Sequence, residues 1–238
     1  MISCPGTVGH CLECCDRLPL FMKAEVEPTL KFYDCQPAPS PRRVRIFIAE
    51  KGLEIETVEV DLGNREQLGE EFRKINLDCT VPVLELDDGT RLSEIFAICQ
   101  YLEETFPEPI LMGRDATERA LVTMWNTKIE HQGLAAMSEC LRNRAKGMKG
   151  RALTGPDDFE QIPELVDRGL RRFELFMDKM DRHLKDKEYV TGDTFTVADI
   201  SLLVGIDFAA WSKITITDAM VNLRRWYDLV SVRSGTQV

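Results

Sequence analysis

The segment from Thr80 to Leu86 carries the clearest candidate for ligand-binding chemistry in this sequence. Pro82 stands at the start of an apolar run with strand composition, where a proline removes a hydrogen bond from the ladder. A proline tolerated at such a place is typical of a cis peptide bond in a tight bend. We therefore expect the bend to leave the N–H and C=O of Val81 open for hydrogen bonds instead of burying them in a sheet.

Cysteines near the start of the chain offer a second kind of chemistry. Cys11 and Cys14 have the spacing of a metal-binding or redox pair, and His10 and Cys4 stand nearby. No second cysteine pair follows at the distance of a zinc ribbon, and Cys35 ends a predicted strand. We therefore expect no metal site, and we interpret residues 1–29 as an N-terminal extension without fixed structure.

Composition and charge exclude several classes of protein. The 238 residues are 44% hydrophobic and 29% charged, as in an ordinary globular protein. A formal net charge of −10 argues against nucleic acid as a partner. The longest apolar stretch, Ile200 to Trp211, contains Asp207 and is too short to span a bilayer, and residues 1–22 show no secretory signal. We expect a cytoplasmic protein with reduced cysteines and no membrane partner.

The elements that position the bend follow in regular order from Leu30 onward. A loop after the first strand leads into a helix, with Ser40 as the expected N-cap and Pro41 at the first helical position. The predicted elements are strands at 30–34 and 54–60, helices at 40–51 and 66–75, a hairpin of 82–86 with 91–93, and a helix from about 95. The order β-α-β-α-β-β-α predicts a thioredoxin-like α/β domain over residues 30–106.

The second half of the sequence predicts helices alone. Two prolines cannot lie inside a helix, so we assign residues 107–116 to a linker and residues 117–238 to an all-helical domain. The first of these helices should run from Thr117 to about Cys140 and turn its apolar residues inward: Leu121, Met124, Trp125, Ile129 and Leu134.

Another helix of this half, from Val197 to about Trp211, is apolar nearly all round, which predicts a central, buried position. Thr196 and Asp199 before and inside it have the spacing of a capping box. We interpret Asp199 as a structural residue.

Six short motifs in order resemble the cytosolic glutathione transferases from about Leu30 to Val230. They are Tyr33–Asp34, Ser40 to Ile46, Ala49 to Gly52, Asn76 with Val81–Pro82, Glu94 with Ala97–Ile98, and Gly192–Asp193 with Ala198–Asp199. The resemblance implies a thioredoxin-like half that binds glutathione and a helical half that builds the pocket for a small hydrophobic electrophile. It also implies a homodimer.

The resemblance assigns contacts to glutathione residue by residue. Val81, held by Pro82, should offer main-chain bonds to the cysteinyl unit, and Glu94 a carboxylate to the γ-glutamyl amine. Ile95 stands where the family has Ser or Thr, so its amide can serve while the hydroxyl contact is lost. Arg42, together with its neighbour Arg43, meets the glycyl carboxylate or lies on a solvated helix face.

The group that activates the sulfur is the open question. A free thiol is only about 3% ionised at pH 7, so a donor must stabilise the thiolate. Ala38 falls where related classes have Ser or Cys, and it has no donor. Ser40 or the backbone at the start of its helix could serve instead. The resemblance to a subgroup without the first-strand donor places Ser138 at its serine and Arg142 at its histidine, and it makes Ser138 the first candidate, ahead of Ser40. An arginine can bind a thiolate or water but cannot act as a base.

Three hypotheses for the function follow. The first is an enzyme that adds the glutathione thiolate to a hydrophobic electrophile. The second is a glutathione-dependent disulfide reductase that uses backbone activation or Cys35, with Cys79 beside the bend as another thiol. The third is a transferase-like binding module without turnover, which the missing donor at Ala38 and the presence of Ile95 both favour.

Overall fold

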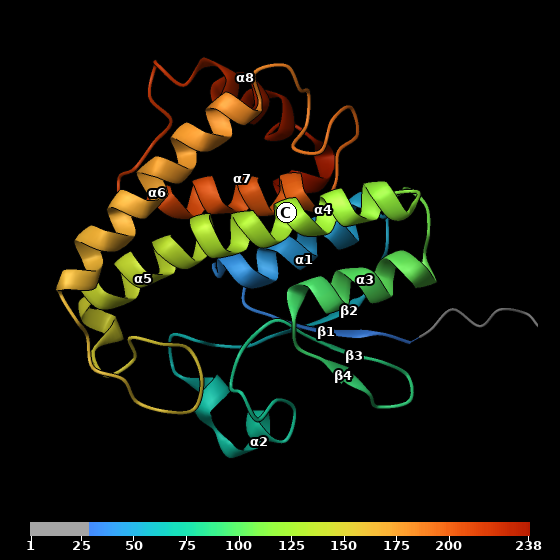
Figure 1. Ribbon diagram of the computed structural model, residues 1–238. Coiled ribbons are helices and arrows are strands. Elements are labelled where there is room, and N and C mark those ends of the chain that lie inside the picture. The colour runs from blue at the N-terminus through green and yellow to red at the C-terminus, as the bar shows by residue number, and fades with distance from the viewer. Residues whose placement is uncertain (1–28) are drawn as a thin grey trace, which may run out of the picture.

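The structure is a computed structural model that describes residues 29–238, and Figure 1 shows its elements. The stretch interpreted as an N-terminal extension, residues 1–29, lies outside the described residues apart from Thr29. The pair Cys11 and Cys14 therefore lies outside them as well.

Four strands form one mixed sheet. They are β1 (Lys31–Asp34), β2 (Glu56–Glu59), β3 (Val83–Glu85) and β4 (Arg91–Leu92), in the spatial order β2-β1-β3-β4. β1 pairs parallel with β2 and antiparallel with β3, and β3 pairs antiparallel with β4. Lys31 lies opposite Glu56 on one side and opposite Glu85 on the other. β1 is therefore an inner strand, and the β1–α1 connection lies beside the bend that precedes β3.

Three α-helices accompany this sheet, and their order confirms the predicted thioredoxin-like fold. They are α1 (Pro39–Glu50), the short α2 (Glu70–Arg73) after a 3₁₀ turn at Glu66–Leu68, and α3 (Ile95–Thr105). α1 ends as expected: Lys51 is its C-cap, and Gly52 follows in the left-handed region with φ of 66°.

The start of α1 differs from the prediction, because Ser40 is not the N-cap. Ala38 takes that position with extended φ and ψ of −80° and 136°, Pro39 begins the helix, and Ser40 lies in the first turn. The fixed φ and the missing N–H of proline suit the first helical position, so Pro39 and Pro41 both permit a helix start. The chain begins the helix at the earlier proline.

The second half contains helices only, among the residues described. They are α4 (Ala116–Ile129), a π-helical segment (Glu130–Leu134) that continues into α5 (Ala135–Arg144), a 3₁₀ turn (Lys146–Met148), α6 (Glu164–His183), α7 (Val197–Ala210), α8 (Val221–Val230) and a 3₁₀ turn (Ser234–Gln237). The π-helical segment interrupts what the periodicity predicted as one continuous helix, and π-bulges of this kind occur often at functional sites.

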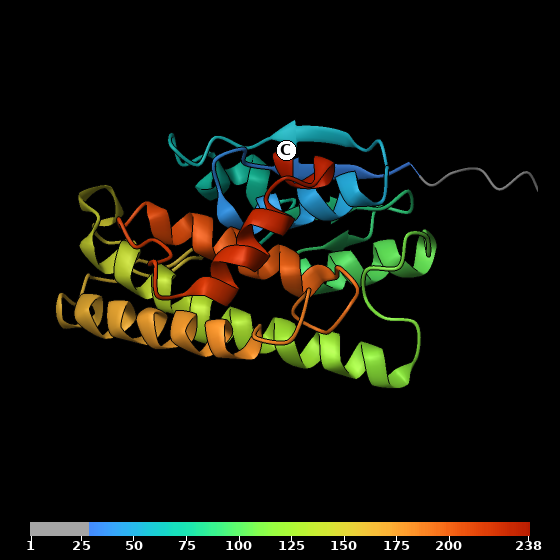
Figure 2. The ribbon, with the colours of Figure 1, turned by 90° about the horizontal axis from the view of Figure 1, so that it is seen from above.

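α7 lies at the centre of the molecule, as predicted. Nearly all of its side chains are buried, and Figure 2 shows it between the sheet with α1 on one side and α6 on the other. Asp199 completes the expected capping box by accepting the Thr196 N–H at 3.0 Å. The prediction for Leu121 and Met124 was wrong: both are 39% exposed, because α4 turns Val122 and Asn126 inward beside the correctly predicted Ile129.

One hydrophobic core runs through both halves of the chain and joins α1, α3, α4 and α7. No helix among the described residues is long and apolar enough to cross a membrane. Residues 29–238 also contain no group of three or more His, Cys, Asp and Glu side chains placed to hold a metal ion.

Candidate active site

The bend before β3 has the form that its proline predicts. The peptide bond between Val81 and Pro82 is cis. The Asn76 side chain holds the preceding loop, since its Nδ2 donates to the Thr80 carbonyl oxygen at 2.9 Å and its Oδ1 accepts the Asp78 N–H at 3.0 Å. Neither the N–H nor the C=O of Val81 bonds to any backbone group of residues 29–238. A ligand with its own main chain can therefore pair with them.

Cys79 belongs to the same loop, but its thiol is turned inward. The residue has a positive φ of 54°, its side chain is buried, and its Sγ lies 3.6 Å from the Leu77 carbonyl oxygen. Cys35 at the end of β1 is also buried, and burial raises the pKa of its thiol above the ordinary value. The environment of Cys35 therefore disfavours a reactive thiolate, because burial penalises the charged form.

α3 begins beside this bend with open polar groups. Glu94 is its N-cap and is exposed, and its carboxylate makes no capping bond to the helix. The first intrahelical bond runs from the Ile98 N–H to the Glu94 carbonyl oxygen at 2.9 Å, so the amides of Ile95 and the next two residues have no helical acceptor. This combination of an exposed carboxylate and open amides suits a ligand that carries both an amine and a carboxylate.

The first turn of α1 offers fewer donors than an ordinary helix start. Pro39 and Pro41 have no N–H, and the Arg42 N–H already donates to the Ala38 carbonyl oxygen at 3.3 Å. Ser40 alone supplies an amide without a helical acceptor there, together with its hydroxyl. Figure 1 shows that α1 and α3 both begin at the end of the molecule nearer to the loop 145–163. Ser40 is therefore the residue of this turn that can donate hydrogen bonds to a ligand, through its amide and its hydroxyl.

Ser138 lies on α5, in the helical half, and contacts of its neighbours show where it stands along α7. The helices α4 and α5 run beside α7 in the same direction. Three contacts mark this register: the Ser201 hydroxyl donates to Asn126 Oδ1 at 2.7 Å, Gly205 packs on Leu134, and Arg144 donates to the Ser212 hydroxyl at 2.9 Å. Ser138 follows Leu134 by four residues, so it lies on the face toward α7 and close to the level of Asp207. Asp207 lies two residues after Gly205, so it points about 200° away from the α5 side of α7. It pairs there with Arg42 of α1.

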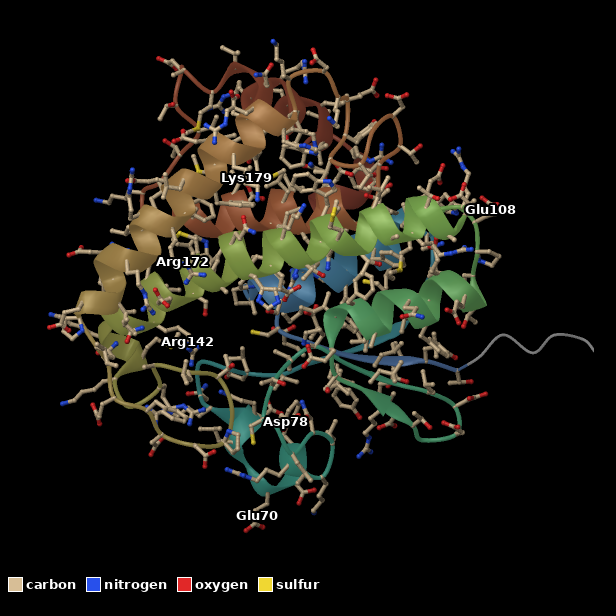
Figure 3. All side chains as sticks on the ribbon, viewed as in Figure 1. Glu70, Asp78, Glu108, Arg142, Arg172 and Lys179 are labelled. Atoms are coloured by element: carbon tan, nitrogen blue, oxygen red, sulfur yellow. The ribbon has the colours of Figure 1, made fainter. Side chains whose placement is uncertain are left out.

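Arg142 uses its guanidinium to hold a loop. It donates to the carbonyl oxygens of Arg151 at 2.7 Å and Leu153 at 2.8 Å, and burial lowers its pKa from the usual value. Arg151 is itself buried and donates to the Asp157 carbonyl oxygen at 3.2 Å. In Figure 3 this loop lies between Arg142 and Asp78, and a side chain at Gly155 would come within 3.9 Å of the Asp78 carbonyl oxygen. Arg142 thus orders a loop that reaches the bend.

Arg42 is turned away from the bend. Its Nη1 lies 2.6 Å from Asp207 Oδ2 on α7, and the Tyr227 hydroxyl donates to the other oxygen of Asp207 at 2.7 Å. Its neighbour Arg43 makes a two-bond pair with Glu130, at 3.0 and 3.1 Å. The bend with Val81 and the starts of α1 and α3, with Ser40, Glu94 and Ile95, lie at one end of the sheet, whereas the Arg42 guanidinium is engaged elsewhere. One signal of this pair was visible in the sequence: beside the capping residue Asp199, Asp207 is the one acidic residue of the largely apolar α7.

These features define a class of protein: a thioredoxin-like domain with an open main-chain binding site, completed by a helical second half. Residues 38–105 match the family "Glutathione S-transferase, N-terminal domain", and residues 163–229 match "Glutathione S-transferase, C-terminal domain". The first match covers the bend, α1 and α3, and the second covers all of α6 and α7 and most of α8, whereas α5 with Ser138 and Arg142 lies between the two.

Similar proteins support the same assignment. Glutathione S-transferase 2 of Saccharomyces cerevisiae is 33% identical over 210 residues, which cover 86% of this chain and 87% of the yeast protein. Glutathione S-transferase Z1 of Arabidopsis thaliana is 41% identical over 176 residues, or 74% and 75% of the two chains. The crystal structure of Gtt2 from Saccharomyces cerevisiae matches with a TM-score of 0.80 at 32% identity, covering 87% of this chain and 98% of the other.

The chain belongs to the glutathione S-transferase family. It is therefore a transferase with glutathione as its co-substrate, which confirms the resemblance found in the sequence.

Proposed function

We propose that this enzyme conjugates the glutathione thiolate to a small hydrophobic electrophile, as a cytoplasmic detoxification reaction. The observation that carries the proposal is the convergence of open donors and acceptors at one end of the sheet: the main chain of Val81, the start of α3, and the first turn of α1. The free state of Cys35, Cys79, Cys99 and Cys140 supports a reducing compartment.

Each part of the tripeptide has a proposed partner. The N–H and C=O of Val81, oriented by Pro82, bind the main chain of the cysteinyl unit. The Glu94 carboxylate binds the γ-glutamyl amine, and the Ile95 amide binds the γ-glutamyl carboxylate. The glycyl carboxylate was assigned to Arg42 from the sequence, but a guanidinium already paired with Asp207 supports that assignment poorly.

We assign activation of the sulfur to Ser40, with Ser138 as a second donor. Lowering the pKa of a thiol from about 8.5 by two units takes about 2.7 kcal/mol of selective thiolate stabilisation. Hydrogen bonds to a charged group contribute roughly 1.5–3 kcal/mol each, so one or two donors suffice. Ser40 offers both an amide and a hydroxyl in the first turn of α1. Arg142 contributes indirectly, by holding the loop 145–163.

The chemistry with an aryl halide as the probe is a simple displacement. The thiol proton leaves to solvent, the sulfur forms a bond to the ring carbon, and the halide departs with its electron pair. The disulfide reductase hypothesis finds less support, because burial raises the pKa of Cys35.

Two measurements test the proposal. The protein should be retained on immobilised glutathione and should conjugate a chromogenic aryl halide. The pH profile of kcat/KM reports the pKa of the bound thiol. Ser40→Ala should raise that pKa by about one unit, since one lost hydrogen bond is worth roughly 1.5 kcal/mol. Ser138→Ala should raise it less, and Ser234→Ala, exposed near the end of the chain, should leave it unchanged. Absence of both retention and conjugation in the unmodified protein would refute the proposal.

A homodimer is a further part of the proposal, supported by one face of the helical half. Leu121 and Met124 on α4 are each 39% exposed, and Leu175 on α6 is 49% exposed. Figure 3 shows the cations Arg172 and Lys179 on the same helix as Leu175. Such a mixture of apolar and cationic side chains suits an interface with a second copy of this acidic chain. Leu175→Glu should shift the mass measured by sedimentation from dimer to monomer.

A further inference from the structure

A three-residue network joins the start of α1 to the helical half. Arg42 Nη1 lies 2.6 Å from Asp207 Oδ2, and the Tyr227 hydroxyl donates to Asp207 Oδ1 at 2.7 Å. Both charged side chains are only 26% exposed. Burial and the bond to Asp207 raise the pKa of Tyr227 to about 12, so its hydroxyl stays protonated and remains a donor. The Asp207 carboxylate therefore has one bond to each of its oxygens and a fixed orientation.

The first turn of α1 needs such an external support. Pro39 and Pro41 remove two of its amides, and its first helical bond, from the Arg42 N–H to the Ala38 carbonyl oxygen, is long at 3.3 Å. Arg42 is the residue that makes this bond, and its side chain is the one that Asp207 holds. Ser40 stands two positions earlier in the same turn, so a displacement of Arg42 displaces the amide and hydroxyl of Ser40.

A cavity gives solvent access to this network. It has a volume of about 330 Å³ and is lined by Arg42, Asp207 and Tyr227 together with Ser231, Thr236 and Gln237. A small ion can therefore reach the position of the Asp207 side chain when that side chain is shortened. This access makes a chemical-rescue experiment feasible.

We propose that Asp207 is a positioning residue for catalysis: its carboxylate, oriented by Tyr227, anchors Arg42 and so fixes the first turn of α1 that presents Ser40 to the glutathione sulfur. The inference rests on the proposed function. It assigns Arg42 to support of the turn in place of contact with the glycyl carboxylate, and it makes activation of the sulfur depend on both halves of the chain.

The first test replaces Asp207 with alanine and measures the pH profile of kcat/KM with the aryl halide. The thiol pKa should rise and kcat/KM at neutral pH should fall about three- to tenfold, the usual range for a residue that couples to a site without touching the ligand. The KM for glutathione should change little, because Val81 and Glu94 are untouched. Asp228→Ala, an exposed acidic position on α8, is the matched control and should behave as the unmodified protein.

Formate provides the rescue. Added to Asp207→Ala, it should lower the thiol pKa toward the original value, whereas chloride at equal ionic strength should not. A thiol pKa unchanged by Asp207→Ala, or one that formate and chloride affect equally, would overturn the proposal. Tyr227→Phe serves if the alanine variant does not fold, since it keeps the ion pair but frees the carboxylate; the thiol pKa should then rise by a smaller amount, and no rise would again overturn the proposal.

Amide hydrogen exchange separates this inference from the proposed function. Peptides that cover residues 38–45 should exchange faster in Asp207→Ala than in Asp228→Ala, whether or not the protein conjugates the aryl halide. Equal exchange in the two variants would refute the positioning role. Failure of conjugation and retention in the unmodified protein would instead refute the proposed function.

Discussion

Replacing Lys51 with methionine should destabilise the protein by about 3–5 kcal/mol, the usual cost of removing one partner from a buried ion pair. The Lys51 side chain is 0% exposed, and its Nζ lies 2.6 Å from Glu103 Oε2. It also donates to three carbonyl oxygens of the segment between α3 and α4, those of Phe106 at 2.8 Å, Pro107 at 3.2 Å and Pro109 at 2.7 Å. Methionine keeps the apolar stem but leaves four oxygens without their cation.

Two backbone amides near Glu103 keep the destabilisation by Lys51→Met within the range of about 3–5 kcal/mol. Its carboxylate still accepts the N–H groups of Leu111 at 3.0 Å and Met112 at 2.9 Å after Lys51 is removed. The charge therefore remains partly solvated by amides, although its side chain is only 14% exposed. The double variant Lys51→Met with Glu103→Gln should cost less than the sum of the single variants, because the two residues share one network.

Thermal unfolding followed by calorimetry measures the effect. One kcal/mol shifts the midpoint of a protein of this size by about 2–4 °C, so Lys51→Met should lower it by about 6–20 °C. Lys31→Met is the matched control, because Lys31 pairs with Glu56 at 3.4 Å with side chains 36% and 60% exposed. Such a pair contributes about 1 kcal/mol or less. If both variants shift the midpoint equally, the buried cation does not hold this segment and the reasoning fails.

Three further predictions concern the helical half. Gly169→Ala should destabilise the protein by about 1–3 kcal/mol, since the added Cβ would lie 2.6 Å from a backbone oxygen of α5. Gly147→Ala is the control and should be neutral, because its Cβ would meet no atom within 4 Å. Equal melting temperatures of the two variants would contradict this. The His183 ring stacks on Trp125 at 3.7 Å, and burial lowers its pKa. The contribution of His183 to the free energy of unfolding should therefore be fully present above a pH of about 6.5 and be lost as the pH falls through the lowered pKa. His183→Gln should remove this dependence, and an NMR titration at or above the ordinary pKa would refute it. Asp199→Asn should lower the unfolding free energy by about 1–3 kcal/mol in a calorimetric scan. The NH₂ group of asparagine would face N–H groups that now donate to the carboxylate, and two donors cannot pair. An unchanged midpoint would count against that account.

The fold could be predicted because its signals are local. The alternation before Val60, the hairpin turn at Asp88 and Gly89, and the apolar run of α7 each identify an element from its own residues. The order of those elements then determines the architecture. The cis bond at Pro82 was predictable for the same reason: the proline and the apolar run that it begins are adjacent in the sequence.

The predictions were wrong where two local conformations have similar energies, or where only tertiary packing determines which residues are buried. The segment Pro39–Ser40–Pro41 satisfies the rules for a helix start in two registers, and the sequence alone does not rank them. The apolar stripe of α4 likewise included Leu121 and Met124, but a helix near a surface buries only one narrow face. The π-helical segment at Glu130–Leu134 shifts the faces of α5 relative to α4, which a single 3.6-residue period does not predict.

The adjacent arginines of α1 show why the candidate site was harder to predict than the fold. From the sequence, Arg42 and Arg43 carry the same prediction, yet consecutive helical residues point about 100° apart and meet different neighbours. Arg42 pairs with Asp207, 165 positions later in the chain, and Arg43 pairs with Glu130, 87 positions later. The helix that begins beside the proposed sulfur site is thus held from two directions by the other half of the chain. No local pattern contains such contacts, because they exist only once α7 and the π-helical segment have packed against α1.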